Sequence, residues 1–210
     1  MKNLESPAYK LALFGALGSL GSAMLVEALS RQWEATALLD DLNAIPSRPG
    51  IRAKLGEPFD ALAVSHAVAG MDAVLCNLCS QPLLASARQQ ATTEFEVEFR
   101  AITALLDGLA MARVKRLLVI GDFRWLDEKV GYRPEPGVQL QQRLLDSTLD
   151  WTLVDAPSVG GEDLFAMDDF LTPSESNEPD ALTALRRFAA AVLDECQLTV
   201  HGHQRVRIQG

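Results

Sequence analysis

The sequence predicts an α/β fold in which a mostly parallel sheet is covered by helices on both faces. Short apolar runs of strand character alternate along the chain with longer segments of helical periodicity. The first apolar run passes directly into a glycine series, Gly15–Gly21, and then into a helix-like stretch. Alternation of this kind gives parallel strands, and right-handed crossovers place the connecting helices on both faces of the sheet.

Strands are expected at short segments that are mostly apolar. Residues 50–55 differ, because apolar side chains there alternate with Arg52 and Lys54, a period of two that suits a half-exposed strand at the sheet edge. The expected strands are, in order, 10–14, 34–39, 50–55, 73–78, 116–120, 151–154 and a short final one at 206–208.

Helices are expected where apolar side chains recur every three or four residues. These segments are 20–32, 60–68, 94–112, 137–146 and 180–196, and Asp60 is the expected N-cap of the second. Residues 81–93 are small and polar and are expected to form a loop. The stretch 157–179, rich in Pro, Gly and acids, is expected to form a small irregular lobe over the strand ends, so that residues 1–210 make one domain.

The bulk composition favours a soluble protein that acts on a small molecule. The chain is 48% hydrophobic and 22% charged, as folded soluble proteins are, and no apolar run approaches the roughly 20 residues of a membrane span. A net charge of −9 disfavours nucleic acid and anionic membranes as partners. Three cysteines and an N-terminus without an apolar segment favour the cytoplasm. The apolar side of 94–112 is long enough to pair two copies in a homodimer.

The glycine series has the spacing of a dinucleotide-binding turn. Gly15 can make the tight turn, Gly18 lets a pyrophosphate approach the backbone, and Gly21 lets the helix lie close to the strand. The N–H groups of the first helical turn would then face the phosphates. Asp40, 19 positions after Gly21, can accept hydrogen bonds from an adenosine ribose and would repel a 2′-phosphate. Arg48 and Arg52 could instead serve such a phosphate, which leaves NADP open.

Four sequence blocks occur in the order seen in atypical short-chain dehydrogenase/reductases, and the chain resembles that family over about residues 8–209. The blocks are the glycine series, Ala69–Val74, Val114–Gly121 and Leu149–Thr152. The branch that it resembles most contains NADH-flavin reductases and NAD-dependent epimerase/dehydratases. The resemblance implies a Rossmann fold, a nicotinamide cofactor on the strand ends and a substrate pocket built from C-terminal loops.

Carried over position by position, the resemblance implies a cofactor site. Asp40 stands where many relatives have an arginine for the NADP phosphate, which favours NAD, and Glu57 stands where relatives place an aspartate beside the adenine. Asn77, Leu78 and Cys79 would border the adenosine and ribose. Gly121 and Asp122 would end a strand beside the nicotinamide. The glycine loop would hold the pyrophosphate with Gly15, Ala16, Leu17, Gly18, Ser19, Leu20 and Gly21.

The chain departs from this family in the proton relay. Relatives that interconvert alcohols and ketones use a tyrosine four positions before a lysine, with a nearby serine. Here Tyr132 is followed four positions later by Pro136, Tyr9 by Leu13, and Asp122 follows Gly121 where a serine is expected. Losing a general acid typically costs ~10²–10⁴ in rate, whereas the N5 atom of a flavin accepts hydride itself. No catalytic residue is therefore assigned.

Three functions remain open at this stage. The first is NAD(P)H-dependent reduction of a flat acceptor, such as a quinone or the flavins FMN and FAD. The second is a non-catalytic dinucleotide-binding regulator or redox sensor, and the third is a sugar-nucleotide epimerase or dehydratase. Trp125 and Tyr132 follow a strand end, where either could stack on a flat substrate or pack the fold.

Two short motifs are interpreted as structural. Cys76 and Cys79 form a C-x-x-C pair that ends a strand rather than opening a helix, so an inert role is favoured over a redox role. His201 and His203 make an incomplete metal site, so no metal is expected.

Overall fold

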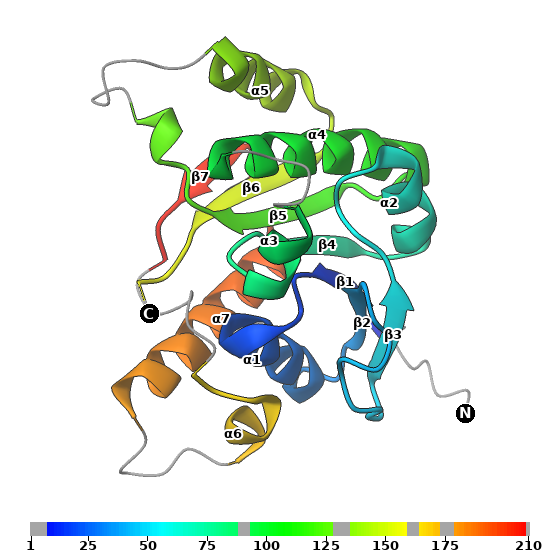
Figure 1. Cartoon of the computed structure of the whole chain (residues 1–210), viewed down its shortest axis with the longest axis vertical. Helices are drawn as coiled ribbons and strands as arrows, with labels where there is room; N and C mark the ends of the chain where they lie inside the picture. The colour runs from blue at the N-terminus through cyan, green and yellow to red at the C-terminus, as the bar shows by residue number, and fades with distance from the viewer. Residues whose placement is uncertain (1–7, 88–92, 128–134, 159–163, 173–178, 209–210) are drawn as a thin grey trace, which may run out of the picture.

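A computed structural model describes residues 8–87, 93–127, 135–158, 164–172 and 179–208. Seven parallel strands form one sheet in the order β3-β2-β1-β4-β5-β6-β7 (Figure 1). Their bounds are β1 Lys10–Phe14, β2 Glu34–Leu39, β3 Ile51–Leu55, β4 Ala73–Asn77, β5 Arg116–Gly121, β6 Asp150–Asp155 and β7 Gln204–Val206.

Helices cover both faces of the sheet, as the alternating pattern predicts. Along β1, Leu11 and Leu13 point into one hydrophobic cluster, whereas Ala12 and Phe14 point into the other. The first cluster packs beneath α1 (Gly18–Ser30), α6 (Met167–Leu171) and α7 (Asp180–Leu198), and the second beneath α2 (Ala61–Val68), α4 (Glu94–Ala112) and α5 (Glu135–Asp146). The core is therefore two layers separated by the sheet, the arrangement of a doubly wound fold.

The strand order places a crevice between β1 and β4. Strand β1 pairs with β2 on one side and with β4 on the other. The connections from β1 and β4 leave on opposite faces, through α1 and α4, so the carboxyl ends of these two strands form the switch point at which such sheets bind ligands.

Two segments differ from the expectation. Residues 81–93, expected to be a loop, contain a helix, α3 (Gln81–Ala87), and the expected lobe at 157–179 contains α6. Pro82 suits the first turn of α3, because that position needs no N–H donor. Strand β7 lies at 204–206 instead of 206–208, and α1 begins at Gly18, two residues earlier than expected. Asp60 caps α2 as expected, because its side chain accepts a hydrogen bond from the N–H of Ala63 (2.7 Å).

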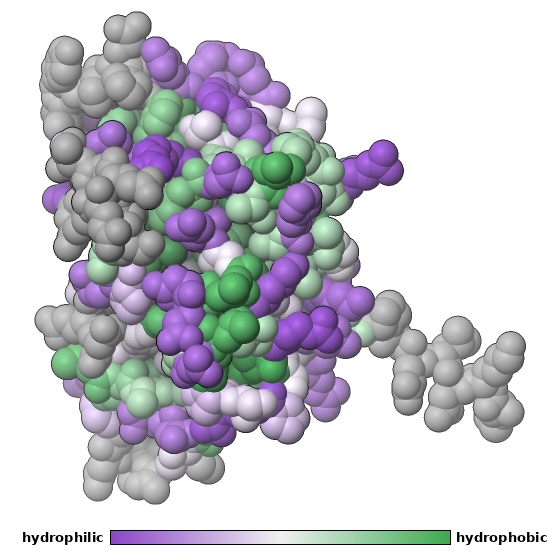
Figure 2. Space-filling view, turned by 45° about the vertical axis from the view of Figure 1, so that its right-hand side comes forward, coloured by the Kyte–Doolittle hydropathy of each residue, from purple (hydrophilic) through white to green (hydrophobic). Residues whose placement is uncertain are grey.

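The side of the molecule that carries β3 and α2 mixes polar and apolar groups (Figure 2). Leu55 on β3 and Leu62 on α2 are exposed. Arg52 is also exposed, and β3 is an edge strand as its alternating pattern predicts. In the described part of the chain, no helix has both the length and the apolar character needed to cross a membrane.

A buried ion pair ties α7 to the sheet. The guanidinium of Arg116 on β5 donates to the carboxylate of Glu195 on α7 (2.9 Å), and both side chains are 6% exposed. Arg116 also donates to Thr152 and to main-chain oxygens, and Glu195 accepts from the backbone and ring of His201. Because nearly every polar atom of the pair is hydrogen-bonded, the network offsets the cost of burying its charges.

Candidate functional site

The glycine loop has a backbone that only glycine fits. Gly15 (φ +69°) and Gly18 (φ +86°) adopt left-handed conformations. A Cβ on Gly15 would overlap the carbonyl oxygen of Asn77, and a Cβ on Gly21 would overlap the main chain of Ala16. The roles expected of Gly15 in the turn and of Gly21 in helix packing are therefore both met by the geometry.

The first turn of α1 keeps its amide donors available. Its N-cap residue, Leu17, offers no side-chain oxygen, and the first turn contains no acidic residue. The N–H groups at this helix end therefore receive no cap from the side chain of the N-cap residue. A helix start of this kind, following a strand and a glycine turn, binds anions such as phosphate.

The end of β4 holds the glycine loop in place. Asn77 is 1% exposed, and its amide donates to the carbonyl of Gly15 (3.1 Å) while its side-chain oxygen accepts from the N–H of Cys79 (3.1 Å). The hydroxyl of Ser80 donates to the carbonyl of Leu17 (3.1 Å). Asn77, Leu78 and Cys79 thus lie beside the glycine loop, and the Asn77 amide is committed to shaping it.

The segment that precedes α6 braces the loop from the other side. The hydroxyl oxygen of Ser19 accepts a hydrogen bond from the N–H of Phe165 (2.8 Å). Phe165 also packs against the core cluster on the α1 face, with its ring 6.2 Å from that of Phe170. A segment far along the chain therefore contributes to the walls of the crevice.

Asp40 and Glu57 come together at the end of β2, beside a recess of about 490 Å³. Both carboxylates are exposed, and both also line a narrow gap of about 30 Å³ between the glycine loop and α3, where Pro82 and Leu83 lie. The recess has room for an aromatic base, whereas the gap holds only a water or two.

The two arginines considered for a 2′-phosphate lie elsewhere. Arg52 lines a hollow at the amino ends of the strands, together with Lys10 and Gly70. Arg48 forms an ion pair with Asp168 of α6. Among the described residues, the carboxylates of Asp40 and Glu57 lie at the end of β2, whereas Arg48 and Arg52 do not.

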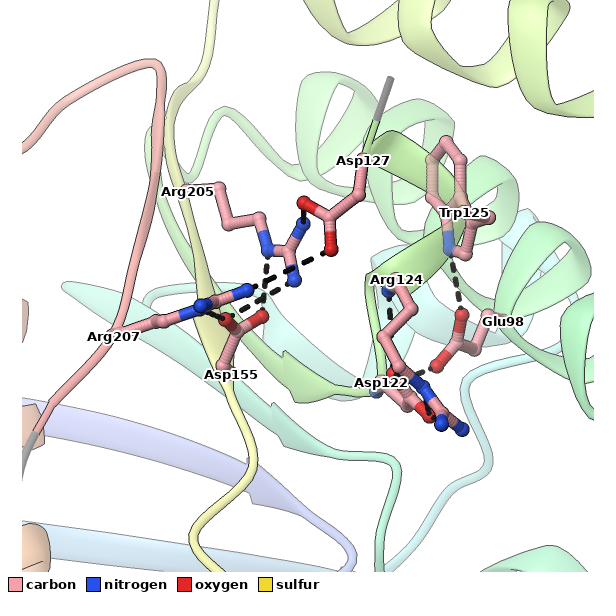
Figure 3. Close-up of polar contacts among 8 residues, drawn as sticks. All are labelled: Glu98, Asp122, Arg124, Trp125, Asp127, Asp155, Arg205 and Arg207. Atoms are coloured by element: carbon pink, nitrogen blue, oxygen red, sulfur yellow. Dashed lines mark hydrogen bonds and ion pairs between the residues drawn. The ribbon is translucent and has the colours of Figure 1, made fainter. Parts of the chain in front are cut away.

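A larger cavity of about 550 Å³ lies at the carboxyl ends of β5 and β6. Gly121 and Asp122, expected beside the nicotinamide, line it together with Pro157. Arg124, Arg205 and Arg207 line it as well, and Figure 3 shows how these arginines meet the neighbouring aspartates. The cavity therefore lies at the end of β5, where the sequence analysis expected the substrate to bind.

Asp122 is held in its ionised form in this cavity. Partial burial raises the pKa of Asp122, but hydrogen bonds from the side chain and backbone of Arg124 outweigh it, so the pKa lies below its ordinary value. Asp155 accepts from Arg205 (2.6 Å) and from Arg207 (2.7 Å). A carboxylate that stays ionised cannot donate a proton, so Asp122 does not replace the serine of the missing relay.

Glu98 on α4 is a functional candidate that the sequence analysis missed. It is 7% exposed, and its carboxylate accepts hydrogen bonds from the N–H of Asp122 (2.9 Å) and from the indole of Trp125 (2.9 Å) (Figure 3). Trp125 lies on the short helix η1 (Arg124–Leu126). Glu98 stands four residues before Ile102 on the buried face of its helix, and an acid on an apolar face is the signal that could have identified it.

The sulfur and histidine motifs show no ligand-binding geometry. Burial raises the pKa of the Cys76 thiol far above its ordinary range, and burial with nearby Glu98 and Asp122 raises that of Cys79 to about 12. His201 bonds to Glu195 (2.8 Å). Among the described residues, no group of three or more His, Cys, Asp or Glu side chains could hold a metal ion. Tyr132 lies outside the described residues.

The sequence matches the NAD(P)H-binding family over residues 15–164. A Burkholderia pseudomallei protein, provisionally named as exported, has a TM-score of 0.62 at 23% identity, over 96% of this chain and 100% of that one.

Two further structures carry more specific names. A Rossmann-fold NAD(P)-binding family protein from Shigella flexneri has a TM-score of 0.63 at 15% identity, over 97% of this chain and 94% of that one. A wide-type short-chain dehydrogenase/reductase from Veillonella parvula, in complex with NADP, has a TM-score of 0.58 at 11% identity, over 97% and 94%. These likenesses confirm the predicted Rossmann-like fold.

Proposed function

Since the chain belongs to the NAD(P)H-binding family, we propose that it is an oxidoreductase that uses a nicotinamide dinucleotide to reduce a flat acceptor such as a flavin or a quinone. The dinucleotide would lie across the carboxyl ends of β2, β1, β4 and β5. Its pyrophosphate would be held at the glycine loop, its adenosine near Asp40 and Glu57, and its nicotinamide near Gly121 and Pro157.

The observation that carries this proposal is the geometry of the glycine loop. Gly15 and Gly18 have left-handed backbones, a Cβ on Gly21 would overlap Ala16, and the amides of the first turn of α1 have no side-chain cap. These features fit a diphosphate, because its oxygens need close approach to the backbone and several N–H donors. The gap between this loop and α3 has a volume of only about 30 Å³, so a dinucleotide that used this gap would require α3 to shift.

The charges at the end of β2 favour NAD over NADP. Asp40 and Glu57 are both exposed carboxylates at the recess where the adenosine would lie. A ribose 2′-hydroxyl can donate to a carboxylate, whereas a 2′-phosphate would bring a further negative charge against two existing ones. Lys54 lines the same recess, but its ammonium donates to the carbonyls of His66 and Ala67.

The choice of acceptor follows from the proton chemistry. The bound cofactor supplies hydride, and the chain's own residues hold the two rings in place and exclude water. Neither tyrosine of the sequence is followed by a lysine at the fourth position, and Asp122 is held ionised. An acceptor that takes hydride without a positioned acid suits this site better than a ketone does.

Two measurements test the proposal. NADH and NADPH titrations followed by protein fluorescence should give tighter binding of NADH, and Gly18→Val should abolish binding while the circular dichroism spectrum stays unchanged.

NADH mixed with FMN or a naphthoquinone should lose its nicotinamide absorbance only when the protein is present. Binding without turnover would instead favour a dinucleotide-binding regulator, for which the missing relay is the evidence. Absence of binding would refute both functions.

A further inference from the structure

The cavity at the ends of β5 and β6 is unusually rich in cations for this chain. Three arginines and two aspartates line it, although the net charge of the whole protein is −9. We propose that the acceptor reduced here carries an oxyanion, a phosphate or a carboxylate, and that Arg207 and Arg124 bind it. This proposal rests on the proposed function, because it assigns the substrate class of the same site.

Arg205 is committed to holding the fold. Its side chain is 16% exposed and makes three hydrogen bonds to carboxylates, two to Asp155 (2.6 and 3.1 Å) and one to Asp127 (2.8 Å). These contacts join the strand end of β6 to the residue that follows η1. Arg205 therefore positions the cluster and has few donors left for a ligand.

Arg207 is placed differently. It is 71% exposed, and within the described residues it makes one close contact, from Nε to Asp155 (2.7 Å), and one longer ion pair with Asp127 (3.6 Å). A guanidinium has five N–H donors in a planar fork, and most of those on Arg207 remain for a ligand that enters the cavity. Two parallel N–H···O bonds from such a fork match a phosphate or carboxylate edge.

The aspartates hold the arginines in place before a ligand arrives. Asp155 is 18% exposed and accepts from both Arg205 and Arg207, so the side chain of Arg207 is oriented by a carboxylate that is itself held by a second arginine (Figure 3). Arg124 is oriented in the same way, because its Nε donates to both carboxylate oxygens of Asp122 (2.8 and 2.6 Å), while its side chain is 77% exposed. An oriented side chain loses less conformational entropy when it binds, which favours recognition of a small anion.

The charge count sets the expected size of the effect. The lining residues carry three positive and two negative charges, but Asp127, which is not part of the lining, pairs with both Arg205 and Arg207. Attraction should therefore come from short-range hydrogen bonds rather than from a long-range field. We expect an acceptor with an oxyanion to bind about tenfold more tightly than the same ring without one.

Flavins provide a matched test, because FMN and riboflavin share one ring system and differ by a phosphate. Their dissociation constants are measured without NADH, by quenching of flavin fluorescence, for the unaltered protein, Arg207→Gln, Arg124→Gln and Arg143→Gln. Arg143→Gln is the control, because Arg143 is a partly exposed arginine that pairs with Asp107, away from the cavity. A carboxymethyl flavin distinguishes a carboxylate from a phosphate. NADH affinity is measured on the same samples.

The proposal expects FMN to bind more tightly than riboflavin. This difference should be reduced in Arg207→Gln and Arg124→Gln and retained in Arg143→Gln. Equal affinities for FMN and riboflavin would overturn the proposal, and so would a difference in affinity that survives in both Arg207→Gln and Arg124→Gln. The proposed reductase function would still hold in either case if NADH is oxidised. If neither flavin binds but NADH does, the anion proposal fails, and oxidation of NADH by a naphthoquinone then distinguishes a reductase from a regulator. If NADH does not bind either, the proposed function itself has failed.

Discussion

A side chain on Gly15 would overlap the backbone carbonyl oxygen of Asn77, because the end of β4 lies directly against the glycine loop. The Asn77 amide returns a hydrogen bond to the carbonyl of Gly15 (3.1 Å). The two residues are 62 positions apart, and together they fix the turn from which α1 begins.

This contact predicts a specific effect of Gly15→Ala. The substitution should abolish NADH binding and lower the free energy of unfolding by about 3 kcal/mol, part from backbone strain and part from overlap with Asn77. Gly70→Ala is a matched control, because Gly70 has a similar backbone (φ +78°) but open space around its Cβ position. It should cost about 1 kcal/mol and leave NADH affinity unchanged. Urea unfolding and fluorescence titration measure both quantities, and equal losses in the two variants would contradict the close-contact argument.

The buried pair of Arg116 and Glu195 predicts a pH-dependent stability. Burial raises the pKa of Glu195, but hydrogen bonds from His201 and the charge of Arg116 outweigh it and hold the pKa below its ordinary value of 4.5. A lowered folded-state pKa stabilises the protein above the ordinary pKa, and that stabilisation is lost as the pH falls through the folded-state value. Glu195→Gln should therefore cost about 3 kcal/mol near neutral pH, because it leaves the charge of Arg116 buried, and much less near about pH 3.

The exposed pair of Arg143 and Asp107 provides the comparison. Both side chains are at least 40% exposed. Asp107→Asn should change the free energy of unfolding by less than about 1 kcal/mol at any pH, because exposed ion pairs contribute little. Denaturant unfolding across the acid range distinguishes the two variants. If Glu195→Gln lowers the free energy of unfolding by the same amount at neutral and acid pH, the charge of the Glu195 carboxylate is not what stabilises the protein.

The cysteines should be unreactive in the folded protein. Burial raises the pKa of Cys79 and of Cys196 to about 12, and that of Cys76 further still. With a pKa of about 12, only roughly one thiol in ten thousand is a thiolate at about pH 8. A thiol reagent should therefore label the native protein slowly and all three cysteines after unfolding. One fast-reacting thiol in the native protein would reopen the redox interpretation of the C-x-x-C pair.

Trp125→Phe tests how Glu98 supports the cavity, because the Glu98 carboxylate accepts hydrogen bonds from the indole of Trp125 and from the N–H of Asp122, a lining residue. The variant keeps the aromatic ring but loses the indole donor to Glu98, so unfolding should become easier by about 1–2 kcal/mol. The acceptor KM should rise several-fold while NADH affinity holds, because Trp125 lies at the end of β5 and away from the glycine loop. Trp33→Phe, a change at a buried tryptophan that packs against Tyr9, is the control. It should reduce stability without changing the acceptor KM.

The fold was predictable from the sequence because its strands are continuous apolar runs. Residues 10–14 and 34–39 are strands in the structure, since one exposed charged residue followed by four or five mostly apolar, buried residues suits a strand covered on both faces. Helix α3 was missed because its seven residues are too few to show a helical period. The glycine loop was predictable for a different reason, because its chemistry is local and depends on three glycines with fixed spacing.

The ion pairs of the cavity were not predictable, because their partners are distant in the chain. Arg205 and Asp155 are 50 positions apart and Arg205 and Asp127 are 78 apart, so they meet through the pairing of β5 with β6 and of β6 with β7. Glu98 and Trp125 meet for a similar reason, since α4 packs across the end of β5. Local spacing identified the residues that build the turn, whereas the residues that build the opposite wall required the tertiary structure.

If the proposed dinucleotide enters through the gap of about 30 Å³ between the glycine loop and Leu83, this gap would limit how quickly it binds. Encounter by diffusion would be followed by a slower step in which α3 retreats. The observed association rate should then level off as the dinucleotide concentration increases, and the plateau would measure how often this helix opens. Substitutions that shorten Leu83 should raise that plateau rate more than they change the dissociation constant of the dinucleotide.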